Sequence, residues 1–285
     1  MNNESQIKEL VKEKYAAIAE QSLTQNATSC CGATSSCCGD EVYNIMSDDY
    51  TKMEGYNPDA DLGLGCGLPT EFAKIKAGDT VIDLGSGAGN DAFIARKIVG
   101  ENGKVLGIDF TDAMINKARV NAEKLGFNNV EFRLGDIDDM PVTSNYADVI
   151  VSNCVLNLVP NKHKVISEMF RVLKPGAHFS ISDIVLEGAL PAKWKDVAEL
   201  YAGCVSGAIQ KQVYLEMITA AGFTNVTMQK EKEIIIPDTI LKNYLSDAEI
   251  ADYKKGNTNI TSITVYAEKP AIDERNCCVP GSGCC

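Results

Sequence analysis

The stretch Thr80-Val-Ile-Asp-Leu-Gly-Ser-Gly-Ala-Gly-Asn-Asp91 predicts a buried strand that runs into a glycine turn and then into a helix. Its first half is an apolar run of strand type, and residues 92–99 carry helical periodicity. The backbone can approach a ligand closely at three alternate glycines, which are Gly85, Gly87 and Gly89. Asn90 stands where the dinucleotide pattern G-x-G-x-x-G needs its third glycine, so the spacing disfavours NAD as the ligand.

The charges around this loop favour a cationic ligand. A pyrophosphate is usually held by helix-end amides and a nearby cation, yet no Lys or Arg occurs between Lys76 and Arg96. Carboxylates flank the loop instead, at Asp83 and Asp91. S-adenosylmethionine carries an ammonium and a sulfonium, and it is the cofactor that this charge pattern predicts.

Two further acids follow the next two predicted strands. Asp109 ends the strand 104–109, at the offset where a carboxylate can accept both ribose hydroxyls of a nucleoside. Asp136 follows the strand 130–134, where its carboxylate could accept from the adenine amino group, and Ile137 beside it is counted with the cofactor site. Met114, on the intervening helix, is either an adenine contact or a residue of the helix core, and both interpretations stay open.

Strands and helices alternate along the chain. Strands separated by helices of about ten to fifteen residues indicate an α/β fold with a doubly wound, Rossmann-like sheet that binds ligands beyond the carboxyl ends of its strands. A late antiparallel strand pair is predicted to complete this mostly parallel sheet. The additional predicted strands are 147–152, 179–185, 226–236 and 260–268. The predicted helices are 7–18, 69–75, 111–126, 165–173 (closed by Lys174-Pro175-Gly176), 192–203 and 210–221, with a polar helical insert between the last two strands.

Composition shifts divide the chain into four predicted parts. An N-terminal helix and a cysteine-rich arm occupy residues 1–41, and the cofactor-binding core occupies 42–190. Capping helices over the substrate and the final strand pair follow in 191–269. A Pro/Gly/Ser tail that also carries cysteines fills 270–285, and the small polar residues of arm and tail predict flexible segments.

The overall composition is that of a soluble globular protein: 285 residues, 45% hydrophobic and 23% charged. A net charge of -12 without a basic cluster argues against nucleic acid and anionic membrane as partners. No apolar run approaches the roughly eighteen residues of a membrane span, and the first twenty residues are too charged for a signal peptide. We therefore expect a cytoplasmic monomer that acts on a small molecule.

Eleven cysteines in such a chain indicate metal binding or redox chemistry rather than a disulfide scaffold. Eight of them form two C-C-x5-C-C clusters, whose role is open between a metalloid-capturing site, a four-cysteine zinc site and surplus thiols. The arm cysteines are Cys30, Cys31, Cys37 and Cys38, and the tail cysteines are Cys277, Cys278, Cys284 and Cys285. The other three are single and widely separated: Cys66, Cys154 and Cys204.

The order of glycine loop, acids, Lys-Pro-Gly turn and late strand pair resembles the class I S-adenosylmethionine-dependent methyltransferases, over residues 42–268. The motifs Leu64-Gly-Cys-Gly67, Ser152-Asn-Cys-Val-Leu156 and Tyr201-Ala-Gly-Cys-Val-Ser-Gly-Ala208 resemble the arsenite methyltransferases specifically. This resemblance implies that the three single cysteines hold trivalent arsenic and that an upstream cysteine takes part in redox turnover. It also implies arsenite or its thiol conjugates as substrate, and a thiol reductant such as thioredoxin or glutathione. Which arm cysteine is the redox partner stays open.

The residues agree with this chemistry. Cys154 directly follows the fourth strand, whose carboxyl end lies beside the glycine loop in a doubly wound sheet. The chain holds only two histidines, His163 and His178, and is therefore poor in bases for an oxygen or nitrogen acceptor. Trivalent arsenic needs no base, because its lone pair attacks the methyl carbon once soft thiolates have displaced its hydroxyls.

Two other functions remain open. A methyltransferase for an organic small molecule such as a quinone or sterol would use the cysteines only as buried core residues. A non-catalytic, thiol-based metalloid-binding protein would not need the cofactor acids.

Overall fold

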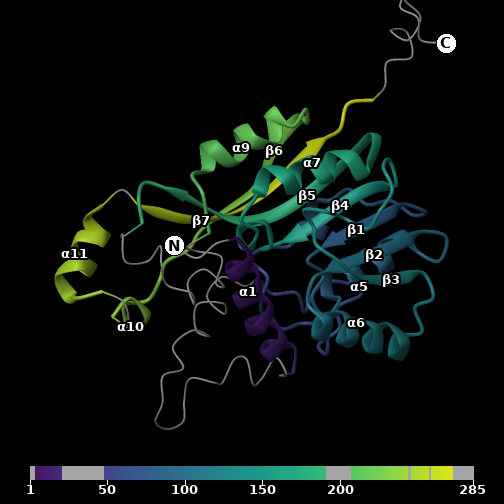
Figure 1. Ribbon diagram of the computed structural model, residues 1–285, viewed down its shortest axis with the longest axis horizontal. Helices are drawn as coiled ribbons and strands as arrows, with labels where there is room; N and C mark the ends of the chain where they lie inside the picture. The colour runs from purple at the N-terminus through teal and green to yellow at the C-terminus, as the bar shows by residue number, and fades with distance from the viewer. Residues whose placement is uncertain (1–3, 21–47, 191–206, 243–244, 257, 272–285) are drawn as a thin grey trace, which may run out of the picture.

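The computed structural model describes residues 4–20, 48–190, 207–242, 245–256 and 258–271 (Figure 1). Its strands are β1 (Thr80–Leu84), β2 (Lys104–Asp109), β3 (Val130–Leu134), β4 (Ala147–Asn153), β5 (Leu173–Glu187), β6 (Thr224–Glu233) and β7 (Asn259–Glu268). Within the described residues these seven strands form one sheet in the order β3-β2-β1-β4-β5-β7-β6. The first five pair in parallel, whereas β7 runs antiparallel to both β5 and β6. The predicted Rossmann-like sheet with a late antiparallel pair is confirmed.

Helices cover both faces of the sheet. They are α1 (Glu4–Ala19), α4 (Pro69–Phe72), α5 (Asn90–Val99), α6 (Asp112–Leu125), α7 (Lys162–Val172), α9 (Lys211–Ala220), α10 (Asp238–Leu241) and α11 (Asp247–Lys255), with a 3-10 turn at Leu156–Leu158. Figure 1 shows α5 and α6 on one face and α7 and α9 on the other. Successive strand residues alternate between faces, so Ile82 and Leu84 pack toward α7 and α9 while Val81 packs toward α5 and α6. Asp83 therefore shares the face of Val81.

Helix α1 contributes side chains to two different apolar clusters of the molecule. Val11 is buried in the same apolar cluster as Cys66 and Cys154, whereas Ile18 is buried in the cluster beneath α5 and α6. The Lys117 ammonium donates to the carbonyl of Ala19 at 2.8 Å and fixes the end of the helix. The amphipathic helix predicted at 7–18 is thus confirmed with longer bounds, and it reaches further than one flank of the core.

Several boundaries differ from the sequence prediction. Lys174, Pro175 and Gly176 belong to β5, because α7 ends at Val172 and Leu173 already pairs with Ala147 of β4. The helix predicted at 69–75 ends at Phe72, after which Lys74 takes a positive φ of 50°.

The helix predicted at 192–203 lies outside the described residues. So do most of the part predicted at 1–41 and nearly all of the tail, and the four-part division stays a prediction. Across the described segments, no helix has both the length and the apolar character that a membrane crossing requires.

Candidate functional site

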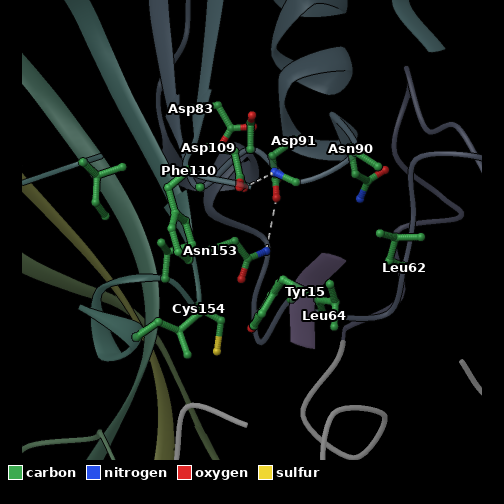
Figure 2. Close-up of a pocket in the computed structure, with 18 of the residues that line it drawn as sticks. Tyr15, Leu62, Leu64, Asp83, Asn90, Asp91, Asp109, Phe110, Asn153 and Cys154 are labelled. Carbon is green, nitrogen blue, oxygen red and sulfur yellow. Dashed lines mark hydrogen bonds between the residues drawn. The ribbon is translucent and has the colours of Figure 1, made fainter. Parts of the chain in front are cut away.

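A pocket lies at the carboxyl ends of β1, β2 and β4 and is covered on one side by α1. Figure 2 shows the carboxylates of Asp83, Asp91 and Asp109 gathered at one end of the pocket and Cys154 at the other, with Tyr15 of α1 on the Cys154 side. This is the edge at which a doubly wound sheet binds its ligands, and the glycine loop lies along it.

The glycine loop is fixed to the end of β2. The backbone N–H groups of Gly85 and Ser86 donate to the carbonyl of Ile108 at 2.8 and 3.0 Å, and that of Gly87 donates to Asp109 Oδ2 at 3.0 Å. Gly85 has a φ of +65°, and a Cβ there would lie 2.5 Å from the Val155 side chain. The loop therefore needs glycine at this position both for its conformation and for its packing.

Three buried carboxylates give the pocket its negative charge. Burial raises the pKa of Asp83 well above its ordinary value, and the neighbouring Asp91 and Asp109 raise it further. Burial also raises the pKa of Asp91, to about 6. The largest cause of both shifts is burial, because desolvation disfavours the charged form of a carboxyl group. For Asp91, the hydrogen bonds from Tyr50, Asn153 and Thr70 counter only part of the rise.

Some buried polar atoms that belong to pocket residues form no hydrogen bond within the described structure. Asp83 Oδ2, Ser86 Oγ and Asn90 Oδ1 have no hydrogen-bond partner among the residues that the structure describes. Buried acceptors of this kind are costly unless a ligand satisfies them. A ligand with an ammonium and a sulfonium fits such a donor-poor, anionic wall, so the residues present suit S-adenosylmethionine.

Asp109 ends β2 where the sequence predicts the ribose acceptor. It is buried, and its two carboxylate oxygens accept from the backbone N–H groups of Gly87 and Thr111 at 3.0 and 2.8 Å. Burial raises the pKa of Asp109, and these hydrogen bonds counter part of the rise. A carboxylate has about four acceptor positions, so both oxygens can still accept from a diol.

Where α1 meets the residues that follow β3, the pocket wall holds a cation that the glycine loop itself lacks. Lys8 of α1 places its ammonium 3.3 Å from Asp136 and 3.2 Å from Asp138. Burial lowers the pKa of Lys8, but the hydrogen bond to Asp138 and the two acidic charges outweigh it, so the pKa lies above its usual value. Asp136 is exposed and Ile137 is buried, and both line the pocket. The adenine role of Asp136 stays a prediction.

Gly89 and Met114 are absent from the described residues that line the pocket. Gly89 is the N-cap of α5 with a φ of +101°, and a Cβ there would lie 2.7 Å from the Phe93 ring. Met114 is fully buried in the cluster beneath α5 and α6. This position supports the helix-core interpretation of Met114.

Two of the three single cysteines belong to one buried apolar cluster, and of these two Cys154 lines the pocket whereas Cys66 does not. Cys154 follows β4 in a left-handed conformation, with a φ of +60°, and lines the pocket. Cys66 is fully buried, and both thiols belong to one apolar cluster that also holds Leu158 and Ile184. Cys204, the arm cysteines and the tail cysteines lie outside the described residues.

Asn153 is a site residue that the sequence analysis missed. Its amide oxygen accepts from the N–H of Cys66 at 2.9 Å, and its amide nitrogen donates to Asp91 Oδ2 at 3.2 Å and to the carbonyl of Gly67 at 2.8 Å. The Tyr50 hydroxyl forms a second connection between the same two residues, since it lies 2.9 Å from Asp91 Oδ2 and 3.0 Å from the Gly67 carbonyl oxygen. The available signal was a polar residue at the carboxyl end of β4, next to Cys154.

A model for a methyltransferase domain matches residues 75–222. The arsenite methyltransferase of Halobacterium salinarum is 37% identical over 278 residues, which are 94% of this chain and 68% of that protein. The chain belongs to the arsenite methyltransferase family. The solved structure of an arsenic(III) S-adenosylmethionine methyltransferase from Chlamydomonas reinhardtii is 31% identical in sequence and superposes with a TM-score of 0.62. The match covers 83% of this chain and 75% of the Chlamydomonas chain.

Family membership confirms the resemblance that the cysteine motifs indicated, and it identifies the chain as a methyltransferase. The roles of the individual cysteines stay predictions. A demethylmenaquinone methyltransferase from Lactococcus lactis is 29% identical over 56% of this chain and 63% of its own length. The quinone enzymes are thus more distant from this arsenite methyltransferase, and the pocket and the two buried thiols of the described structure are best interpreted within the arsenite family.

Proposed function

We propose that this enzyme transfers the methyl group of S-adenosylmethionine to trivalent arsenic held by the thiolates of Cys66, Cys154 and Cys204. The observation that carries the proposal is the position of Cys154, which is 5% exposed and lies in the pocket wall opposite the carboxylates of Asp83 and Asp91. A thiol at this point faces the methyl end of a cofactor whose cationic groups lie against those acids.

Different pocket residues would bind different groups of the cofactor. Asp83 and Asp91 would hold the ammonium, Asp109 the ribose hydroxyls, and Asp136 with Ile137 the adenine end. Gly85 and Gly87 allow the backbone to come close. The protein thereby fixes the methyl carbon relative to Cys154, and orientation of this kind replaces a general base in lowering the barrier.

The reaction depends on how arsenic and the methyl group are oriented and on the exclusion of water from the site, more than on proton transfer. The arsenic lone pair forms the As–C bond while the C–S⁺ bond breaks, and the electron pair of that bond stays on sulfur. Positive charge leaves the sulfonium in this step, so the apolar cluster around Cys66 and Cys154 favours the reaction by excluding water. Soft thiolates suit trivalent arsenic better than oxygen ligands do.

Each methyl transfer formally raises arsenic to the pentavalent state, so another transfer requires two electrons. We assign their delivery to thiols: an arm cysteine and Cys66 would give up two electrons to the arsenic as they form a disulfide with each other. A cellular thiol reductant such as thioredoxin or glutathione would then reduce this disulfide by thiol exchange. The tail cysteines would capture free metalloid. We also propose that the enzyme works in the reducing cytoplasm and acts as a monomer.

The test is to incubate the full chain with S-adenosylmethionine, arsenite and a dithiol and to measure methylated arsenic by chromatography with elemental detection. Wild-type protein should give methylated arsenic. Cys154→Ser should abolish it, because a serine hydroxyl stays protonated and hard where a thiolate is soft.

Cofactor affinity serves as the control, and it should stay within about threefold of wild type in Cys154→Ser, a difference of less than 1 kcal/mol. Methylation of a quinone precursor with no methylation of arsenite would favour the organic-substrate function. Tight arsenite binding without any methyl transfer would favour a metalloid-binding protein.

A further inference from the structure

We infer that the Asn153 side chain couples the cofactor pocket to the metalloid thiols, so that cofactor and arsenite each tighten the binding of the other. Asn153 is then a positioning residue, which acts through Cys66 and Asp91 rather than on the reacting atoms. The inference rests on the proposed function, since it assumes that Cys66 holds the metalloid.

The amide of Asn153 joins one residue of each half-site. Its oxygen accepts from the Cys66 N–H at 2.9 Å, and its nitrogen donates to Asp91 Oδ2 at 3.2 Å. A planar amide cannot shift one end without moving the other. The cysteine loop, residues 64–68, also packs directly on this amide, because a Cβ at Gly65 would lie 2.7 Å from Asn153 Nδ2.

A second link runs beside the first. The Tyr50 hydroxyl lies between Asp91 Oδ2 and the carbonyl of Gly67, and the Asn153 amide nitrogen also donates to this hydroxyl. Asp91 is therefore tied to the backbone on both sides of the Cys66 side chain. On its far side the loop is fixed to the sheet, since Ser262 of β7 donates to the Cys66 carbonyl at 2.5 Å.

The coupling is expected to be positive. Asp91 lines the pocket, and a cationic ligand beside it keeps the carboxylate charged and in place. A charged acceptor forms the stronger hydrogen bond, so Asn153 and Tyr50 are held more firmly when the cofactor is bound. The Cys66 backbone is then ordered before arsenite arrives. The same free energy must appear as tighter cofactor binding when arsenite binds first.

This reciprocity supplies a clean measurement. We would titrate S-adenosylhomocysteine, which has no methyl to transfer, by calorimetry with and without saturating arsenite. Arsenite bound elsewhere on the chain changes the ratio of the two cofactor affinities only if its own site is coupled to the cofactor pocket. For wild-type protein we expect a ratio of about ten, within the range of roughly 5–150 that is typical of coupled sites.

Asn153→Asp is the decisive variant. It keeps an oxygen that accepts from Cys66 but loses the donor to Asp91 and places a second charge beside that carboxylate. The ratio should fall to within about twofold of one. Cys66→Ser, with its cofactor pocket intact, should also give a ratio near one and thereby show that the wild-type effect arises at this thiol.

A wild-type ratio retained in Asn153→Asp would overturn the inference, because Asn153 would then only hold the loop. A ratio of one in wild-type protein that methylates arsenite would also overturn it, while the proposed function would stand. If thermal melting shows that Asn153→Asp does not fold, Tyr50→Phe takes its place. That variant removes the parallel link and the hydroxyl that accepts from Asn153 Nδ2, and it should lower the ratio. An unchanged ratio would count against coupling.

Discussion

Replacement of Asp109 by alanine should weaken binding of S-adenosylmethionine by at least about 100-fold. The ribose hydroxyls would lose two charge-assisted acceptors, each contributing about 1.5–3 kcal/mol. Burial raises the pKa of Asp109, so part of this gain is offset by the desolvation of the carboxylate. The lower end, about 3 kcal/mol, is therefore the better expectation, and each 1.4 kcal/mol corresponds to roughly tenfold in affinity.

The same substitution also leaves two backbone donors without their acceptor. The N–H groups of Gly87 and Thr111 lose partners at 3.0 and 2.8 Å, and each orphaned donor costs about 1–3 kcal/mol where water cannot replace the partner. Calorimetric titration with the cofactor must therefore be accompanied by thermal melting without it. Asp112→Ala is the matched control, since it removes the same charge from an exposed residue that pairs only with Lys12 across the described surface.

An affinity of Asp109→Ala within about threefold of wild type, in a protein that still folds, would refute the assignment of the ribose to this carboxylate. A loss of affinity that Asp112→Ala reproduces would point to net charge rather than to the ribose contact.

Three further outcomes are expected. Lys8→Met should speed the release of S-adenosylhomocysteine a few-fold in stopped-flow experiments. It removes the ion pairs of Lys8 with Asp136 and Asp138, and partly exposed pairs contribute up to about 1 kcal/mol each. Lys12→Met, the control, should release the product at the wild-type rate. Burial raises the pKa of Asp183, a buried residue of β5, from 3.8 to about 7. Without cofactor, its contribution to the free energy of unfolding should therefore be complete below about pH 4, fall by up to about 1.4 kcal/mol per pH unit as the pH rises to about 7, and stay level above that. Asp183→Asn should remove this part of the profile, and a profile parallel to that of the wild type would exclude Asp183 as its source. Deletion of residues 277–285 should lower turnover only when arsenite is scarce. Replacement of all four arm cysteines by serine should stop the reaction after about one methyl transfer unless a small thiol is supplied. The opposite pattern in single-turnover and steady-state assays would exchange the roles of tail and arm.

The sequence was sufficient for the sheet and for the acidic half of the site, because both depend on local pattern. Apolar runs, helical periodicity and the glycine spacing are properties of short segments, and the acids Asp83 and Asp109 occupy fixed places at strand ends. The bounds of β5 were harder to predict: Lys174-Pro175-Gly176 has the local chemistry of a helix stop, yet the strand begins at once because Leu173 pairs with Ala147.

Contacts between distant segments could not be read from the pattern. Lys8 reaches Asp136 and Asp138 across about 130 residues, and nothing in the helix 7–18 shows which flank of the core it will cover. Asn153 stood in a motif that was singled out for its neighbour Cys154. Its contacts to Cys66 and Asp91 depend on how a loop 87 residues earlier folds back onto the end of β4.

The position of β7 inside the sheet makes two distant parts of the molecule depend on the same late segment. Among the described strands β6 pairs only with β7, so without Asn259–Glu268 it has no strand to pair with. The Cys66 loop depends on β7 as well, because Ser262 of that strand donates to the Cys66 carbonyl. A chain that lacked β7 is therefore expected to lose both the edge of the sheet and the anchor of the loop that carries the Cys66 thiol.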